Sequence, residues 1–214
     1  MKYHKLVENA KKPNGFWGKM MIKAMNKGHS SLTSWGLEHM NIERTATVLD
    51  IGCGGGKTVD RLCSIVANGK VFGIDYSELS VKSSEKLNSK NILCNKAKIL
   101  QASVSDMPFD DNTFDNITAV ETYYFWPDKE NDVKEVFRVL KQGGTVMLLF
   151  EMLRTDDDPF KWEKVENMLN IKSVTPQEIR AVLESAGFEN INTYTKEGTT
   201  WLCATAQKPK DDEN

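Results

Sequence analysis

The stretch VLDIGCGGGKT, residues 48–58, decides the fold, because in it a buried strand runs directly into a glycine-rich turn. Its end, GGGKT, is similar to a nucleotide-phosphate loop, but that pattern requires a glycine where Ile51 stands. The dinucleotide-binding pattern requires its third glycine where Lys57 stands. The pattern that fits at every position is D-x-G-x-G-x-G, formed by Asp50, Gly52, Gly54 and Gly56. A carboxylate at the strand end repels a pyrophosphate and favours a ligand that brings a cationic group to the turn.

Composition limits the class of protein. The chain has 214 residues, of which 40% are hydrophobic and 27% charged, which predicts one well-buried domain. A formal net charge of -2 argues against nucleic acid as a partner. The four cysteines, Cys53, Cys63, Cys94 and Cys203, form no C-x-x-C pair, so neither a metal site nor a disulfide framework is predicted. Without an uncharged run of about 18 residues, no membrane insertion is expected, and we predict a cytoplasmic protein.

Short apolar runs alternate with amphipathic segments, a pattern typical of an α/β fold with parallel strands. Strands are predicted at 47–52, 70–75, 98–103, 115–121 and 145–151, and helices at 57–67, 78–89 and 129–140. The last of these helices is expected to stop at the QGG turn that follows Lys141. A helix from Thr175 to Gly187 and a hairpin over 189–207 follow. We therefore divide the chain into a helical arm (1–44), a main domain (45–207) with an insertion at about 152–174, and a disordered tail (208–214).

Four motifs in order carry a family resemblance: VLDIGCGGG (48–56), VFGIDYS (71–77), MPFDDNTFD (107–115) and VLKQGGTVML (139–148). Together they resemble class I S-adenosylmethionine-dependent methyltransferases of the small-molecule type, similar to the ubiquinone/menaquinone methyltransferases. The resemblance covers roughly residues 45–207. It implies a Rossmann-like, doubly wound, seven-stranded sheet whose last strand is antiparallel, with the cofactor across the carboxyl ends of the strands. The implied product is S-adenosylhomocysteine.

The resemblance also assigns cofactor contacts. Asp50 is expected to favour the methionine ammonium group, and Asp75 the two ribose hydroxyls, although a turn or helix cap is an alternative role for Asp75. Tyr76 could lie against the adenine. Ser103 stands where family members commonly carry an aspartate for the adenine amino group, and the backbone N–H of Val104 remains available to an adenine nitrogen. The predicted cofactor site comprises Asp50, Gly52, Cys53, Gly54, Asp75, Tyr76, Ser103, Val104 and Glu121.

The methyl acceptor is harder to predict, because methyl transfer needs placement more than it needs a base. The segment ETYYFWPD (121–128) puts aromatic rings at the mouth of the sheet, where they either line the pocket or pack beneath the next helix. His29 is a candidate base in a loop, without a visible partner. We predict His29, Glu121 and Tyr123 as catalytic residues. Glu121 and Glu151 would favour an amine, whereas Tyr123 or His29 acting as a base would suit a phenol or a carbon acid.

The N-terminal arm is predicted to contain an amphipathic helix. Its apolar stripe comprises Trp17, Met20, Met21, Ala24 and Met25, and its lysines Lys19, Lys23 and Lys27 repeat on another face. A cap over the active site and an anchor on an acidic membrane surface both fit this pattern. The alternative functions are therefore a non-catalytic cofactor-binding or membrane-surface module and a nucleotide hydrolase, against S-adenosylmethionine-dependent methyl transfer to a small molecule.

Overall fold

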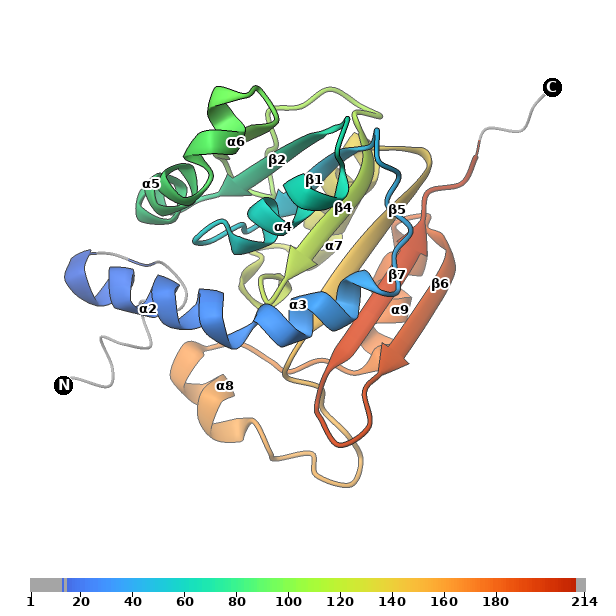
Figure 1. Cartoon of the computed structure of the whole chain (residues 1–214). Coiled ribbons are helices and arrows are strands. Elements are labelled where there is room, and N and C mark those ends of the chain that lie inside the picture. Colours follow the sequence, from blue (N-terminus) through green and yellow to red (C-terminus); the bar gives the residue numbers. More distant parts are fainter. Residues whose placement is uncertain (1–12, 14, 211–214) are drawn as a thin grey trace.

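A computed structural model describes residue 13 and residues 15–210, except the side chains of residues 16, 19 and 23–27 (Figure 1). Its centre is one seven-stranded sheet in the order β3-β2-β1-β4-β5-β7-β6. The strands are β1 (Thr47–Ile51), β2 (Lys70–Asp75), β3 (Ala97–Gln101), β4 (Phe114–Val120), β5 (Leu140–Phe150), β6 (Glu189–Thr195) and β7 (Leu202–Gln207). β1 to β5 are parallel, and β7 is antiparallel to both β5 and β6. The predicted Rossmann-like sheet with an antiparallel last strand is confirmed.

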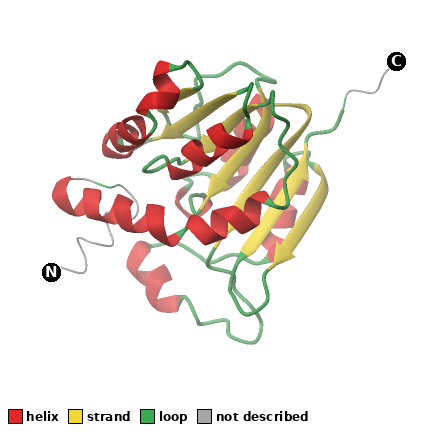
Figure 2. Ribbon diagram, in the orientation of Figure 1, coloured by secondary structure: helices red, strands yellow, loops and turns green. Residues whose placement is uncertain are grey.

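Helices cover both faces of the sheet (Figure 2). α3 (Ser30–Leu37), α4 (Lys57–Ile65) and α5 (Glu78–Leu87) lie on one face, while α7 (Lys129–Val139) and α9 (Pro176–Ser185) lie behind it in Figure 1. The short elements are α6 (Ser89–Leu93), the 3-10 turn η1 (Tyr123–Phe125) and α8 (Glu163–Leu169). Because side chains alternate along a strand, Leu49 packs on the α7 and α9 side and Val48 on the α4 side. Both faces of the strands are therefore buried, which explains their nearly continuous apolar runs.

One predicted boundary is wrong. The QGG sequence does not end α7, since α7 ends at Val139 and β5 begins at the next residue. Gly143 lies within β5 with φ at +72°, next to a shift in the pairing of β5 with β4 between Phe114 and Asn116. This left-handed glycine lets the strand accommodate the shift in pairing. The QGG glycines therefore mark an irregularity in β5 and not the end of α7.

The N-terminal arm contains α2 (Gly15–Gly28), which follows nearly the same line as α3 (Figure 1). It is attached near its start, where the Ser77 hydroxyl donates a hydrogen bond to the Pro13 carbonyl at 3.1 Å. Trp17 and Met20 of the predicted apolar stripe are 42% and 49% exposed and Met21 is half-buried, whereas Ile22, outside the stripe, is buried. The side chains of Ala24, Met25 and the three predicted lysines lie outside the described residues. No helix in the described part of the chain is long and apolar enough to cross a membrane.

The chain remains packed beyond β7. Lys208 is 5% exposed, and its ammonium group donates to Asn112 Oδ1 (2.8 Å) and to the carbonyls of Phe137 (2.8 Å) and Leu140 (2.9 Å). These acceptors come from the β4 entrance and from the α7–β5 junction. The sequence predicts a disordered tail from this same residue, but the structure buries it. Residues 211–214 of that predicted tail lie outside the described residues.

Candidate active site

The glycine loop joins β1 to α4 with three left-handed glycines, Gly52, Gly54 and Gly56, at φ of +67°, +51° and +80°. A Cβ added to Gly52 would lie 2.2 Å from Thr122 Oγ1, whereas at Gly54 the nearest atom would be 4.0 Å away. The loop is therefore packed tightly against the end of β4 at Gly52 and faces open space at Gly54. We call this open space the Gly54 cradle; a side chain at Gly54 would fill it.

Asp50 lies beneath the loop and is only 2% exposed. The Thr118 hydroxyl on β4 donates a hydrogen bond to its carboxylate at 2.8 Å. Burial raises the pKa of Asp50 to about 7, against the smaller opposing effect of this bond. A group that brings a positive charge to Asp50 would favour its ionised form, which matches the ligand predicted from the strand-end carboxylate.

Asp75, at the end of β2, holds two turns with its two oxygens. Oδ2 accepts from the Gly54 backbone N–H (2.9 Å) and Oδ1 from the Ser77 N–H (2.8 Å). Asp75 therefore does have the structural role that the sequence offered as an alternative, since it orders a turn at each of these two segments. Burial raises its pKa, although both bonds favour the carboxylate. The Ser80 hydroxyl also hydrogen-bonds this carboxylate, which leaves about one of its four acceptor positions for a ligand.

Two adjoining cavities follow the carboxyl ends of the strands. One, of about 100 Å³, is lined by the glycine loop, Asp50, Cys53, His29 and Glu121. The other, of about 840 Å³, is lined by residues that include Ser103, Val104, Tyr124 and Trp126. Both are lined by Gly52, Asp75, Tyr76, Thr122 and Phe125. The shared lining makes them neighbouring parts of one site that spans β1 to β4, the place where open α/β sheets bind ligands.

Every residue predicted to contact the cofactor lines one or both cavities: Asp50, Gly52, Cys53, Gly54, Asp75, Tyr76, Ser103, Val104 and Glu121. Ser103 accepts a hydrogen bond from the Ser105 N–H at 3.2 Å, and Val104 is buried. Cys53 contributes a thiol whose pKa burial raises well above its ordinary value, so it is a packed neutral group and not a nucleophile.

The end of β4 has a strained backbone. Glu121 is a non-glycine residue with φ at +57°, and its N–H donates to the Leu149 carbonyl at 2.9 Å. Its carboxylate accepts hydrogen bonds from the Glu151 backbone N–H and, at 3.5 Å, from the Tyr124 hydroxyl. Burial, together with the charge of Glu151, raises the pKa of Glu121 to about 8. This conformation turns the Glu121 side chain toward the smaller cavity and fixes one of its oxygens.

Of the two neighbouring tyrosines, the structure places Tyr124 at the site and not Tyr123. Tyr124 lines the larger cavity, and its oxygen accepts from the Met152 N–H at 2.9 Å. Tyr123 lines neither cavity and packs against Trp126 and Phe150, with ring centroids 5.2 and 5.7 Å apart. Burial raises the pKa of Tyr123 to about 12. The packing alternative therefore describes Tyr123, and the pocket alternative describes Tyr124 and Trp126.

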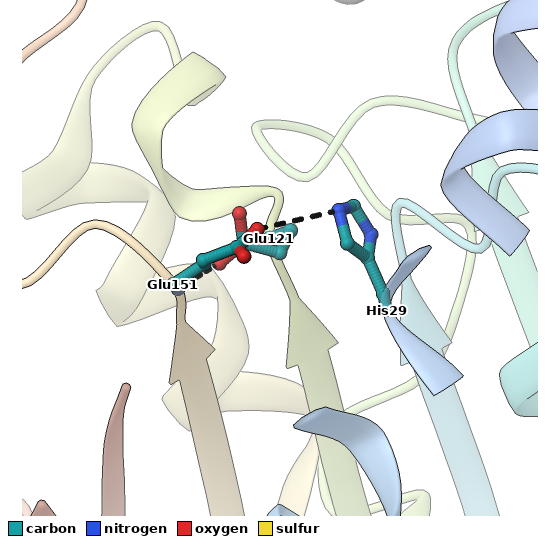
Figure 3. A group of neighbouring side chains, drawn as sticks. All are labelled: His29, Glu121 and Glu151. Carbon is teal, nitrogen blue, oxygen red and sulfur yellow. Dashed lines mark hydrogen bonds and ion pairs between the residues drawn. The ribbon is translucent and has the colours of Figure 1, made fainter. Parts of the chain in front are cut away.

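His29 has the partner that the sequence did not reveal. In the connector between α2 and α3, its Nε2 lies 4.0 Å from Glu151 Oε2 (Figure 3). Its backbone carbonyl accepts from the Thr33 hydroxyl at 2.8 Å, and Arg61 donates to the Ser30 carbonyl and hydroxyl at 3.0 Å each. Burial lowers the pKa of His29, so the imidazole is neutral near pH 7.

Three further residues complete this site: Arg61 and Thr122, which the sequence analysis did not single out, and Glu151, which it named only as a group that would favour an amine and not as the partner of His29. Arg61 positions the His29 connector, Thr122 packs on the glycine loop, and Glu151 faces His29 from the end of β5. No local pattern identifies Arg61 or Thr122, because each acts on a segment far away in sequence. The position of Glu151 directly after a buried strand places it at the mouth of the sheet, but its pairing with His29 has no local signal.

Comparisons with known proteins agree with this geometry. A family model described as a methyltransferase domain matches residues 49–148. An uncharacterized methyltransferase of Bacillus subtilis is 27% identical over 183 residues, which make up 85% of this chain and 93% of that protein. The ubiquinone/menaquinone biosynthesis C-methyltransferase of Cronobacter sakazakii is 31% identical over 181 residues, covering 73% of this chain and 72% of the relative.

A solved structure supports the fold. The Haemonchus contortus phosphoethanolamine N-methyltransferase 2, in complex with phosphomonomethylethanolamine and S-adenosylhomocysteine, has a TM-score of 0.75 over 91% of this chain and 58% of its own, at 13% identity. The glycine cradle, the buried Asp50 and the strand-end Asp75 also fit a ligand that carries an ammonium group and a ribose. The chain therefore belongs to the class I S-adenosylmethionine-dependent methyltransferases.

Proposed function

We propose that the protein transfers a methyl group to a small-molecule acceptor bound beside the ends of β4 and β5. The observation that carries this proposal is the pair of adjoining cavities with a shared lining along the carboxyl ends of the strands. One cofactor would extend through the shared part and leave room for a second, small ligand. A cavity of about 840 Å³ lies in the size range of small-molecule sites.

The residues of the sheet would hold the cofactor. Asp50 and the Gly54 cradle would receive the methionine end, and Asp75 would accept from the ribose hydroxyls. Ser103, Val104 and Tyr76 would surround the adenine at the ends of β3 and β2. When bound, S-adenosylmethionine supplies the electrophilic methyl group of its sulfonium.

The acceptor would lie against Glu121 and Tyr124, which follow β4, and against His29 of the α2–α3 connector. The neutral imidazole of His29 is suited to accept a proton if the acceptor must lose one. The Cronobacter sakazakii relative is a C-methyltransferase of quinone biosynthesis, which favours a phenolic or quinol acceptor over an amine. α2 and α3 would cap this end of the site, because α3 follows the His29 connector directly.

The test is calorimetric titration of the full chain with S-adenosylhomocysteine, with ATP-Mg in parallel. One-to-one binding of S-adenosylhomocysteine alone is expected. ATP-Mg is not expected to bind, because Lys57, the lysine of the GGGKT sequence, forms an ion pair at 2.9 Å with Asp60 of its own helix. Binding of ATP-Mg alone would refute the cofactor assignment and, with it, the proposed reaction.

A further inference from the structure

Three metal-ligating side chains meet at the acceptor end of the site. His29 comes from the α2–α3 connector, Glu121 from the end of β4 and Glu151 from the end of β5 (Figure 3). One ligand atom from each residue lies within 4.8 Å of the other two. We call these three residues the His29 cluster. Each comes from a separate segment, so the tertiary fold and not local sequence brings them together.

The His29 cluster has carboxylate oxygens available to bind a ligand. One Glu121 oxygen accepts from the Glu151 N–H and the Tyr124 hydroxyl, while its second oxygen has no hydrogen bond from the described residues. The Glu151 side chain is 48% exposed, and within the described chain its carboxyl group forms an ion pair with His29 Nε2. Tyr124 and the β5 backbone thus orient Glu121, whereas Glu151 is free to rotate into place.

Apart from His29 itself, no basic side chain among the described residues that line this cavity pairs with the carboxyl groups of the His29 cluster. The Glu121 and Glu151 carboxyl groups lie side by side, and a metal ion would displace the proton that burial favours on Glu121. Arg61 donates to Ser30, and Lys57 pairs with Asp60. A dication would neutralise both carboxylates and would use the imidazole lone pair as well. An organic ammonium would also be attracted to the carboxylates, but it has no need of the third group.

We propose that His29, Glu121 and Glu151 bind a divalent transition-metal ion such as Mn²⁺, Fe²⁺ or Zn²⁺, and that this ion holds an oxygen of the methyl acceptor. An imidazole among carboxylates suits these ions better than Mg²⁺ or Ca²⁺, which prefer oxygen alone. Ligand atoms at roughly 2.0–2.2 Å from one ion lie about 3–4 Å apart. A small rotation of the exposed Glu151 side chain would shorten the present distances between the ligand atoms, which are up to 4.8 Å, to this range.

This inference rests on the proposed function and specifies its substrate class. Three protein ligands leave coordination positions open on the side of the cavity that His29 and Glu121 line. A hydroxyl on the ion would replace a bound water and release its proton to solvent, because the ion lowers the hydroxyl pKa; His29, as a ligand of the ion, would then no longer serve as the proton acceptor. The acceptor would then be a phenol, a quinol or an enol, activated at its oxygen or at a conjugated carbon.

Metal binding is tested on the chelator-treated full chain by titration with Mn²⁺, followed by electron paramagnetic resonance of the free ion. We expect one site per chain. Glu151→Gln and His29→Ala should each weaken it at least tenfold, whereas Glu189→Gln, an exposed change on β6, should leave it unaltered. Absence of a stoichiometric site up to millimolar Mn²⁺, or equal affinity in Glu151→Gln and the unchanged protein, would overturn the proposal.

Two further readouts separate this inference from the proposed function. Glu151 lines neither cavity, so Glu151→Gln should bind S-adenosylhomocysteine as the unchanged protein does while losing the metal. Loss of both would mean that the variant damages the whole site, and Glu151→Asp, which keeps the carboxylate, should then restore metal binding. With Mn²⁺ present, 4-nitrocatechol should show the absorption shift of a metal-bound catecholate. A bound ion without that shift would refute the role of the metal in holding the acceptor.

Discussion

At the scale of the residue, Asp75 serves the site in two ways with one carboxylate. It orders the glycine loop through Gly54 and the start of α5 through Ser77, and it lines both cavities. Its burial, at 8% exposure, makes each of these bonds stronger than it would be in water. Under the proposed function, loop order and cofactor binding would be linked through this one side chain.

Asp75→Ala should weaken S-adenosylhomocysteine binding by about 1.5–3 kcal/mol, or roughly 10- to 150-fold, because hydrogen bonds to a charged acceptor are lost. Calorimetric titration measures the change, and circular dichroism checks that the variant is folded. Glu85→Ala removes the same charge from an exposed position on α5 and should bind normally. Unchanged affinity in folded Asp75→Ala would remove Asp75 from the ribose site.

Asp50 predicts a pH dependence. Burial raises its pKa from the ordinary 3.8 to about 7, so the folded protein keeps a proton that the unfolded chain releases. Its contribution to stability therefore falls as pH rises from about 4 to about 7. A ligand ammonium favours the ionised form, so affinity for S-adenosylhomocysteine should rise by up to about tenfold per pH unit below 7 and then level off.

Titration calorimetry between pH 5.5 and 8.5 tests this dependence. Asp50→Asn should lose most of the rise, whereas Asp60→Asn should retain it, since Asp60 lies at the surface of α4. An equal slope in Asp50→Asn and the unchanged protein would assign the titration to another group.

The sequence placed the residues proposed to hold the cofactor at one edge of the sheet, whereas on the acceptor side it named His29 and Glu121 but not the pairing of His29 with Glu151. Asp50, Gly52 and Asp75 stand at fixed spacings within one β-α-β segment, so a local motif identifies them. The link between His29 and Glu151 joins residues that are 122 positions apart (151 - 29). Its formation depends on how α3 packs on β5, which no local pattern encodes.

At the scale of the element, α9 begins with a capping box. The Thr175 hydroxyl accepts from the Glu178 N–H at 3.2 Å, and Glu178 accepts from the Thr175 N–H at 2.9 Å. Glu178 also pairs with Arg154 of the preceding insertion. This helix start was readable from the Thr-Pro pair, because a capping residue and a proline at the first helical position act locally.

Thr175→Ala should lower the free energy of unfolding by about 1 kcal/mol, since it removes the cap of α9. Urea denaturation followed by circular dichroism measures the loss. Gln177→Ala changes an exposed residue two positions further along the same helix and should cost much less. If both variants lose the same stability, the cap is not what stabilises the start of α9.

The junction of α7 and β5 illustrates the opposite case. The QGG sequence predicts a helix stop from local preference, but pairing of β5 with β4 and β7 incorporates these residues into the sheet. The Gly143 N–H donates to the Lys208 carbonyl at 2.9 Å, a partner that lies 65 positions further along the chain. Sheet pairing across that separation overrides the local signal.

At the scale of the whole molecule, Lys208 ties the C-terminal end of the sheet to its middle. A buried ammonium group is tolerated there because three oxygens within 2.9 Å satisfy it. Lys208→Met should cost about 2–4 kcal/mol, because it leaves those buried oxygens without a donor. Thermal and urea unfolding measure it, with Lys210→Met, at an exposed position, as the control. Equal stability of the two variants would contradict this role.

The two halves of the site differ in how they are attached to the fold. Asp75 ends a strand and the glycine loop directly follows one, but His29 lies on a connector outside the sheet, held by Thr33 and by the contact of Arg61 with Ser30. Under the proposed function, replacing the helical arm would change which molecules are methylated without rebuilding the strand ends proposed to bind the methyl donor. Relatives that share this sheet are expected to diverge first in that arm, so ancestry traced through the glycine loop would say little about their substrates.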